Sequence, residues 1–451
     1  MECRSTKCSG VFAEASASIA AMLNASKPES SPSYKWVVVG LLSIVAFLNE
    51  VDRHAIYALF PLLERELGMS KVALGMLGSA FLWAYAVCGP QAGWVGDRFP
   101  RRYVIASSLV LWSLMTGLNG FAKSGNQLIY LRVLLAVTEA FYVPCALALI
   151  AEYHGENTRS KAIALHLSAM AIGQVSGGFL GGFMGEYFSW RTLFFLLGGA
   201  GILYAPLLLL LLRASPRAVS SSPQTQRPSF LKAGRIVANV STLRFFAIAF
   251  VCYSIAGSVM QTWLPYFLFH NFHTSLAAAG FSAAFYLQLP TAVGNLVGGG
   301  LGDYFATRDY RGRMLVQAGS LLVSAPFLLT MGMAGSITVV ALSLAALGFL
   351  RAGWPPNVMA VIFQVLPSNL SSTTYGFLNF LGNVSAGVAV VAAANLGAVF
   401  GFGVAFGSLT LIHALAAATL LIAAFTRLKY DFIRRPAESG APVAVTPELN
   451  L

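Results

Sequence analysis

Long apolar segments, separated by short polar ones, follow one another along almost the whole chain. About 20 consecutive apolar residues are enough for a helix to cross a bilayer, and twelve segments approach or exceed that length. The pattern therefore predicts an all-α membrane protein with twelve transmembrane helices. They lie near residues 36–60, 72–95, 103–121, 128–151, 162–185, 192–212, 244–269, 276–302, 314–333, 337–364, 374–398 and 402–426.

The longest interior polar segment divides the expected helices into two sets of six. It covers about 213–243 and contains RASPRAVSSSPQTQRPS, whose Ser, Pro and Arg content is typical of a linker. We therefore expect two six-helix bundles, at 36–212 and 244–426. Residues 1–35 are rich in Ser and Ala and lack the apolar core of a cleaved signal peptide, so we expect a disordered cytoplasmic N-terminus there. A similar cytoplasmic tail is expected at 427–451.

Composition and charge agree with a membrane protein. The chain has 451 residues, of which 57% are hydrophobic and 10% are charged, whereas soluble domains contain about 25% charged residues. If the N-terminus is cytoplasmic, 22 of the 29 lysines and arginines lie on the cytoplasmic side or in the two tails. The positive-inside rule then places both termini in the cytoplasm, in a cell (inner) membrane. Because these cations are spread over many short loops, the net charge of +12 does not indicate nucleic-acid binding.

The two halves share sequence features at matching positions. GWVGDRFPRR (93–102) follows the second expected helix, and GGLGDYFATRDYRGR (299–313) follows the eighth. EAFYVPCALALIAE (139–152) and RAGWPPNVMAVIFQ (351–364) also match at an offset of 212 residues, in Ala, Pro, Ile and an aromatic position. Two pseudo-symmetric six-helix halves are a transporter architecture, in which the substrate site lies near mid-membrane between the halves.

Several ionisable residues fall inside the expected helices, most densely in FLNEVDRHAIYALFP (47–61). Each charge at a helix centre costs about 2.5–3.5 kcal/mol on insertion scales, so the set would cost about 15–20 kcal/mol if it faced lipid. We therefore expect these side chains to face the protein interior, in pairs of opposite sign or in water. They are Glu50, Asp52, Arg53, Arg132, Glu139 and Arg351.

Helix geometry suggests which of these charges lie together. At 1.5 Å per residue, Asp52 lies about 24 Å from the cytoplasmic end of its helix, while Arg132 and Glu139 lie about 6 Å and 17 Å from the outer end of theirs. Asp52 and Arg132 then share a level in a core about 30 Å thick. Arg351 is the repeat equivalent of Glu139 and should face it across a central cavity. The alternative is a purely structural cluster, in which Arg132 only neutralises Asp52.

The chemistry of these groups suits ion-coupled transport. An arginine guanidinium binds a carboxylate or phosphate with two hydrogen bonds. Burial raises the pKa of a carboxylate and a neighbouring arginine lowers it, so a buried carboxylate that loses its arginine to a substrate anion binds a proton more easily. We therefore assign proton coupling to Asp52 and Glu139, and binding of an anionic substrate to Arg53, Arg132 and Arg351.

Other polar residues inside the expected helices are candidates for lining the substrate path. The alternative is that they only tie helices together, as polar side chains in membranes often do. The candidates are Tyr85, Tyr253, Gln261, Asn357, Asn379, Asn383 and His166.

Several chemistries are not expected from this sequence. The sequence GGGLG (298–302) does not follow a strand and lacks the Lys-Ser/Thr of a phosphate-binding loop, so transport is expected to be secondary. Five scattered cysteines and the HNFH at 270–273 do not form a metal site, and HExxH and GxSxG motifs are absent. We expect no cofactor, no metal and no enzymatic activity.

The motif GWVGDRFPRR resembles GxxxDRxGRR, the loop signature of the major facilitator superfamily. FLWAYAVCGPQAGWVGDRF (81–99), RVLLAVTEA (132–140) and TWLP (262–265) resemble its anion:cation symporter branch. NEVDR and DRFPRR resemble equally its Spinster-like branch. The resemblance implies the major facilitator fold and transport by alternating access.

The two branches imply different substrates. The first implies proton-coupled symport of an organic anion such as a sugar acid, with sodium as the alternative coupling ion, by a monomer in the lipid bilayer. The second implies export of lysolipids or other amphiphiles. More distant alternatives are a transporter-derived sensor or a membrane-embedded enzyme.

The resemblance also implies a cytoplasmic gate. In the superfamily the loop aspartate, here Asp97, docks on the N-terminus of the eleventh helix when that gate closes. Pro100 and Tyr304 replace the Gly and Arg of the signature and its second copy. The gate residues that the resemblance implies are Asp97, Arg98, Arg101, Glu152 and Asp303.

Overall fold

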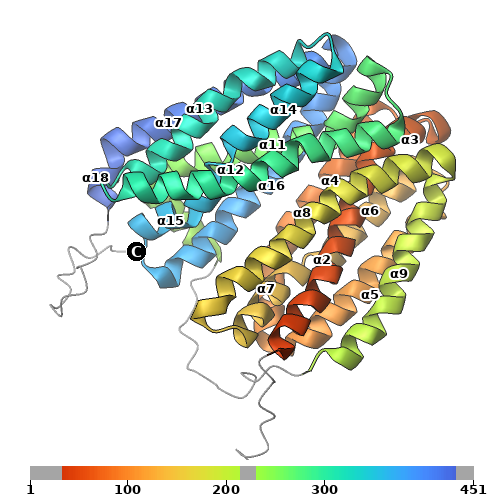
Figure 1. Cartoon of the computed structure of the whole chain (residues 1–451), viewed down its shortest axis with the longest axis horizontal. Coiled ribbons are helices and arrows are strands. Elements are labelled where there is room, and N and C mark those ends of the chain that lie inside the picture. Colours follow the sequence, from red (N-terminus) through yellow and green to blue (C-terminus); the bar gives the residue numbers. More distant parts are fainter. Residues whose placement is uncertain (1–32, 214–229, 433–451) are drawn as a thin grey trace, which may run out of the picture.

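The structure is a computed structural model that describes residues 33–213 and 230–432 (Figure 1). These residues form helices joined by short connections, and no strand occurs among them. The expected N-terminal segment and tail lie outside the described residues, except for Ser33 to Lys35 and 427–432. So does the Ser- and Pro-rich stretch 214–229 of the expected linker.

The described part of the first half contains eight helices, which form one bundle (Figure 1). Each of the six expected helices has a counterpart among them, with α3 as an additional short helix and with the helix expected at 128–151 divided into α6 and α7. They are α2 (Tyr34–Ala58), α3 (Phe60–Leu67), α4 (Lys71–Arg98), α5 (Arg101–Asn119), α6 (Gly125–Glu139), α7 (Tyr142–Tyr153), α8 (Glu156–Tyr187) and α9 (Trp190–Leu211).

The second half repeats this arrangement after a short amphipathic helix, α10 (Phe230–Asn239), which lies inside the expected linker. The Phe230 ring of α10 packs on Phe377 and Phe380, with centroid distances of 5.1 and 5.3 Å. The remaining helices are α11 (Ser241–Phe272), α12 (Leu276–Ala306), α13 (Gly312–Gly332), α14 (Ile337–Arg351), α15 (Pro355–Val365), α16 (Ser368–Phe400), α17 (Phe402–Ile422), the π-helical turn η1 (Ala423–Arg427) and α18 (Leu428–Asp431).

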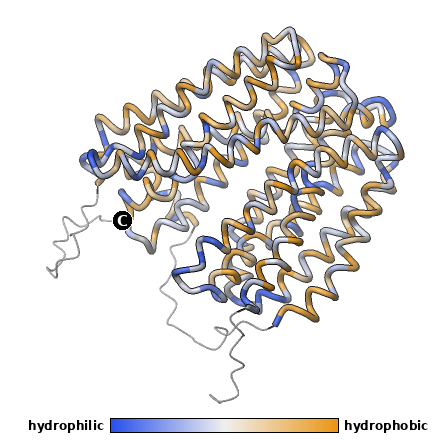
Figure 2. The backbone as a smooth tube through the Cα atoms, in the orientation of Figure 1, coloured by the Kyte–Doolittle hydropathy of each residue, from blue (hydrophilic) through white to orange (hydrophobic). Residues whose placement is uncertain are grey.

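Eleven helical segments of the described chain are long and apolar enough to cross a membrane. The expected helix at 103–121 corresponds to α5, which is not among the eleven. It begins with Arg101 and Arg102 and carries buried Ser113, Thr116 and Asn119, which lower its hydropathy. α5 nevertheless packs along α9 and α6 within the first bundle. Apolar residues predominate along the helices, and hydrophilic ones gather at their ends (Figure 2).

Helix starts repeat between the halves, as the sequence repeat predicts. A serine precedes α4, α6, α12 and α14, and its hydroxyl accepts a hydrogen bond from the backbone N–H three residues later. Such caps satisfy one of the free N–H groups at a helix start. The four serines are Ser70, Ser124, Ser275 and Ser336, and each serine of the first half has its counterpart in the second.

Glycines on α8 allow unusually close helix contacts. A Cβ atom on Gly177 would lie 2.7 Å from the Val51 carbonyl oxygen of α2, and one on Gly181 would lie 2.3 Å from that of Ala55. On the other side of α8, a Cβ atom on Gly178 would lie 2.4 Å from the Gly280 carbonyl oxygen of α12. Small residues thus bring α8 into backbone contact with a helix of each half.

The two bundles converge toward the end of the molecule near α3 and diverge toward α7 and α15 (Figure 1). Hydrogen bonds join them at the converging end, where Ser79 donates to the Gly387 carbonyl (2.6 Å) and Tyr266 donates to Glu64 (2.6 Å). Within the described residues, every recorded hydrogen bond between the halves lies on this side or near mid-helix.

Candidate functional site

Two central charged residues of the site lie where a predicted helix is interrupted. The expected helices at 128–151 and 337–364 are each interrupted: α6 ends at Glu139 before α7, and α14 ends at Arg351 before α15. Interrupted helices at matching positions of two repeats mark binding sites in transporters, because they bring polar groups to mid-membrane. Glu139 and Arg351 therefore occupy equivalent positions, as the offset of 212 residues predicts.

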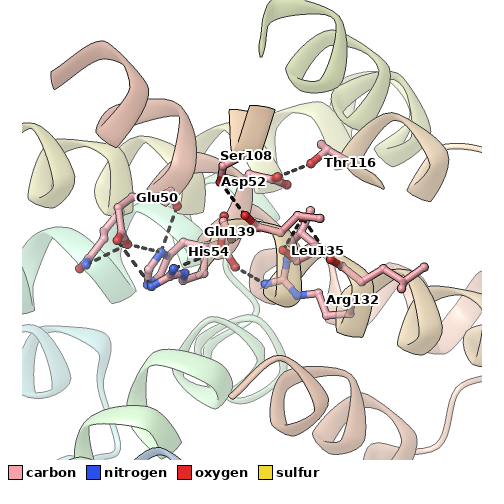
Figure 3. Close-up of polar contacts among 12 residues, drawn as sticks. Glu50, Asp52, His54, Ser108, Thr116, Arg132, Leu135 and Glu139 are labelled. Atoms are coloured by element: carbon pink, nitrogen blue, oxygen red, sulfur yellow. Dashed lines mark hydrogen bonds and ion pairs between the residues drawn. The ribbon is translucent and has the colours of Figure 1, made fainter. Parts of the chain in front are cut away.

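In the first bundle, the Arg53 guanidinium lies between the carboxylates of Glu50 and Glu139; Figure 3 labels the two acids. The Arg53 Nη2 atom lies 3.1 Å from Glu139 Oε2, and its Nη1 atom lies 3.6 Å from Glu50 Oε1. Glu139 is fully buried and Glu50 nearly so. Glu139 Oε1 has no hydrogen-bond partner among the described residues. The guanidinium of Arg53 thus contacts two buried carboxylates.

Asp52 and Arg132 lie in the same cluster without forming an ion pair with each other (Figure 3). Asp52 accepts a hydrogen bond from the Thr116 hydroxyl, and Arg132 donates to the Arg53 carbonyl oxygen at 2.6 Å. No Asp52–Arg132 pair within 4.0 Å occurs in the described chain. The shared depth inferred from the sequence therefore does not produce the neutralising contact that it suggested.

Aromatic rings hold both guanidinium groups. The Phe81 ring centroid lies 4.8 Å from the Cζ atom of Arg53 and 4.8 Å from that of Arg132. Tyr85 stacks on Phe81, with centroids 5.8 Å apart, and lies 5.0 Å from Arg53. Cation–π contacts of this kind are favourable where the cation is desolvated. Sequence reasoning included Tyr85 but missed Phe81, because a phenylalanine in an apolar helix carries no distinguishing signal.

Three further polar residues belong to this cluster and were not among the candidates. His54 Nδ1 lies 3.3 Å from Glu50 Oε2, and Gln174 of α8 donates to the same oxygen at 3.2 Å. Gln288 of α12, in the other half, donates to Gln174. Glutamines inside apolar, glycine-rich helices are a usable signal, but only the fold shows that these two meet.

The second bundle contains a cavity of about 370 Å³. α11, α12, the α14–α15 break and α16 supply its walls. Five of the candidates named from the sequence line it: Tyr253, Gln261, Arg351, Asn379 and Asn383. Gln288 lines it as well, so the cavity adjoins the contact between the halves.

Arg351 is the charged residue of this cavity. Its side chain is buried, and no carboxylate lies within 4.0 Å of it among the described residues. Its Cζ atom lies 4.6 Å from the Tyr253 ring centroid, and Tyr253 stacks on Trp354 with centroids 5.2 Å apart. A Cβ atom on Gly257 would lie 3.2 Å from Arg351 Nη2, so glycine leaves room for the guanidinium.

Asn357 and His166 do not line this cavity, and neither do the first-bundle candidates Arg53, Arg132 and Tyr85. Asn357 is fully buried, and its Nδ2 atom donates to the carbonyl oxygens of Gly298 (3.0 Å) and Gly353 (2.9 Å). It thus ties α12 to the broken helix. His166 is also fully buried, with its ring 6.0 Å from that of Tyr142, and neither ring nitrogen has a hydrogen-bond partner in the described chain.

The contacts recorded for the described gate residues lie within each half. Arg101 pairs with Glu152 in the first half, and Arg313 pairs with Asp303 at 2.5 Å in the second. Arg98 lies over the Trp94 ring, 5.3 Å from its centroid. The side chain of Asp97 lies outside what the structure describes. In this state, no recorded contact of these described side chains bridges the two halves.

Comparison with known families gives one family match for this chain. Residues 42–390 match the family model described as the Major Facilitator Superfamily. The match begins in α2 and ends in α16, so it includes residues of both bundles and of both broken helices.

Curated relatives carry several transporter names. An "MFS-type efflux pump" of Mycolicibacterium smegmatis is 30% identical over 77% of this chain and 81% of its own length. A "Probable galactarate/D-glucarate transporter GudP" of Bacillus subtilis is 27% identical over 78% of this chain and 83% of its own. "Protein spinster homolog 1" of Homo sapiens is 27% identical over 76% of this chain and 69% of its own.

Solved structures share the fold. A bacterial homolog of the human lysosomal transporter Spinster, in an inward-facing and unoccupied conformation, superposes with a TM-score of 0.76. The alignment covers 90% of this chain and all of that one, at 21% sequence identity.

Proposed function

Since the chain belongs to the Major Facilitator Superfamily, we propose that it is a secondary active transporter that carries an organic anion together with protons. The substrate class that the cavity fits best is a sugar acid or a similar hydroxylated carboxylate. Transport proceeds by alternating access of the central cavity to the two sides of a cell (inner) membrane, with both termini in the cytoplasm.

The single observation that carries this proposal is the buried guanidinium of Arg351, which lines the cavity and has no carboxylate within 4.0 Å in the part of the chain that the structure describes. A buried charge without a counter-ion is costly, so the site is stabilised by an anion that enters it. A carboxylate meets the guanidinium with two parallel hydrogen bonds. Arg351 therefore supplies both the affinity and the charge selectivity.

The rest of the cavity suits a polyhydroxylated molecule. Gln261, Asn379 and Asn383 provide amide groups that both donate to and accept from hydroxyls. Trp354 and Tyr253 form an aromatic wall against which the C–H groups of such a molecule can pack. The relatives named as probable galactarate/D-glucarate transporters favour the same class of substrate.

Proton coupling is assigned to the first bundle. Arg53 pairs with Glu139 and Glu50 at once, so these three groups carry one positive charge and two acids. A proton on one acid balances the cluster, and movement of Arg53 away from Glu139 releases that acid to bind a proton. Asp52, which accepts from Thr116, is the second proton-coupling residue.

The second candidate is export of a lysolipid or another amphiphile. The observations that favour it are the Spinster relatives and the apolar part of the cavity wall, which includes Leu287, Val358 and Met359. An anionic head group would bind Arg351 as a sugar acid does, so the two candidates differ in the length of the apolar part of the substrate.

Uptake into proteoliposomes tests the proposal. Purified protein is reconstituted, a pH gradient (acidic outside) is imposed, and accumulation is measured for D-glucarate, other organic acids and a lysolipid, with a sodium gradient in parallel. We expect D-glucarate or a related acid to accumulate under the pH gradient only. Accumulation driven only by sodium, or movement of the lysolipid alone, would contradict the proposal.

A further inference from the structure

A chain of hydrogen bonds connects the cavity of the second bundle with the acids of the first. Gln288, which lines the cavity, donates to the Oε1 atom of Gln174, and Gln174 donates through Nε2 to Glu50 Oε2 at 3.2 Å. Glu50 in turn lies 3.6 Å from Arg53, the partner of Glu139. In the described chain, this is the one recorded side-chain hydrogen-bond path between the two sites.

The direction of this chain follows from the chemistry of its first member. An ionised carboxylate only accepts hydrogen bonds, so Gln174 must turn its NH₂ group toward Glu50. The carbonyl oxygen of Gln174 then faces Gln288, which must donate its own NH₂ group. Gln288 lines the cavity, and no partner is recorded among the described residues for its carbonyl oxygen, which is an acceptor.

A proton on Glu50 Oε2, the oxygen that faces Gln174, reverses each member of this chain. The neutral acid donates its O–H to Gln174, which accepts through its carbonyl oxygen and therefore turns its NH₂ group toward Gln288. Gln288 accepts in turn and presents its own NH₂ group to the cavity. The ionised acid thus offers the substrate an acceptor, and the protonated acid offers it a donor.

We propose that Gln174 and Gln288 form a relay that reports the protonation of Glu50 to the substrate cavity by reversing their amide groups. A carboxylate in the cavity has only acceptor atoms, so it is repelled by the Gln288 oxygen and bound by its NH₂ group. Proton and anion therefore bind together, which is the sign of coupling that symport requires. This inference rests on the proposed function and assigns to Glu50 a role beyond those of Glu139 and Asp52.

Other ionisable groups around Glu50 do not replace the relay. Arg53 and His54 of α2 contact its carboxylate, and Tyr85 of α4 and Tyr142 of α7 interact with it electrostatically. All four belong to the first bundle. The contact that α8 contributes is Gln174, which carries no charge and alone continues toward α12.

Binding measurements on the purified full chain test the relay. The dissociation constant for D-glucarate is measured at pH 5.5 and pH 8.0 for the native protein, Gln174→Met, Gln288→Met and the double variant. We expect native binding to be about tenfold tighter at pH 5.5, a change within the reach of one hydrogen bond to a charged group. Each single variant should lose this dependence, and the double variant should resemble the single ones, because either change breaks the same chain.

Thr291→Val is the matched control. Thr291 lines the same cavity from the same helix, but its hydroxyl donates to the carbonyl oxygens of Leu287 and Gly348 within its own half. Any loss of affinity in this variant should be equal at both pH values. The relay is overturned if Gln174→Met or Gln288→Met keeps the native pH dependence, or if the losses in the double variant add.

A measurement without substrate separates failure of the relay from failure of the proposed function. If native protein does not bind D-glucarate, that proposal fails for this substrate, but pH-difference infrared spectra still report on the relay. We expect acidification to produce a carboxylic acid band that Glu50→Gln removes, accompanied by a change in the glutamine amide band that Gln174→Met removes. An acid band without the amide change, or an amide change that persists in Gln174→Met, would disprove the relay.

Discussion

Glu139 and Arg351 occupy equivalent places in the two halves and carry opposite charges. Each ends the first part of a broken helix, yet Glu139 is paired with Arg53, whereas Arg351 has no carboxylate beside it among the described residues. The same kind of helix break thus carries an acidic residue in the first half and a basic residue in the second. In the proposed function, this difference in sign separates the proton site from the anion site.

Replacing Arg351 by Gln should weaken binding of D-glucarate by about 10- to 100-fold. The change removes the charge but keeps a polar group of similar reach, and hydrogen bonds to charged groups contribute about 1.5–3 kcal/mol. Equilibrium binding to the purified variant measures the effect. Arg308→Gln is the control, because Arg308 is exposed at the end of the α12 region and contacts Tyr304. Equal affinities in both variants would remove Arg351 from the substrate site.

Residues differed in how well the sequence predicted them. Charged residues such as Glu139 and Arg351 could be identified as candidates because a charged side chain that faces lipid has a high free-energy cost. Gln174 and Gln288 could not be paired in advance, since they lie in different halves and are 114 positions apart. Asn357 was a candidate for substrate binding, and its recorded hydrogen bonds tie α12 to the broken helix.

The sequence predicted where the transmembrane helices lie, but it did not predict that two of them are interrupted. The break after Arg351 had a signal in Gly353 and the two following prolines, whereas the break after Glu139 is followed only by Pro144. Hydropathy windows average over such breaks. The α8 glycines bring the backbone of this helix close to those of α2 and α12.

Gly178→Leu should shift the protein away from the state described here. A side chain at this position meets the Gly280 backbone, so α8 and α12 must separate at the end where the halves converge. Spin labels on cysteines at positions 187 and 273, in a background without the native cysteines, should report a longer distance between the halves. Gly199→Leu, whose Cβ atom meets no atom within 4 Å, should leave the distance unchanged. Identical distance distributions in the two variants would show that this contact does not control closure.

The whole molecule consists of two halves that meet at one end and separate at the other (Figure 1). If the termini are cytoplasmic, as the distribution of lysine and arginine predicts, the closed end faces outward and the cavity opens toward the cytoplasm. The two halves and their repeat could be predicted because hydropathy and motifs recur along the chain. The conformational state could not, since it depends on contacts such as Tyr266 with Glu64 that form between distant segments.

The claim that anion and proton move together is tested most directly inside a vesicle. Proteoliposomes containing a trapped pH indicator, with no imposed gradient, receive D-glucarate outside, and its entry and the internal pH are followed together. We predict that the lumen acidifies as D-glucarate enters, and that Glu139→Gln allows exchange of D-glucarate without acidification. Entry of D-glucarate into vesicles with native protein at constant internal pH would contradict the account.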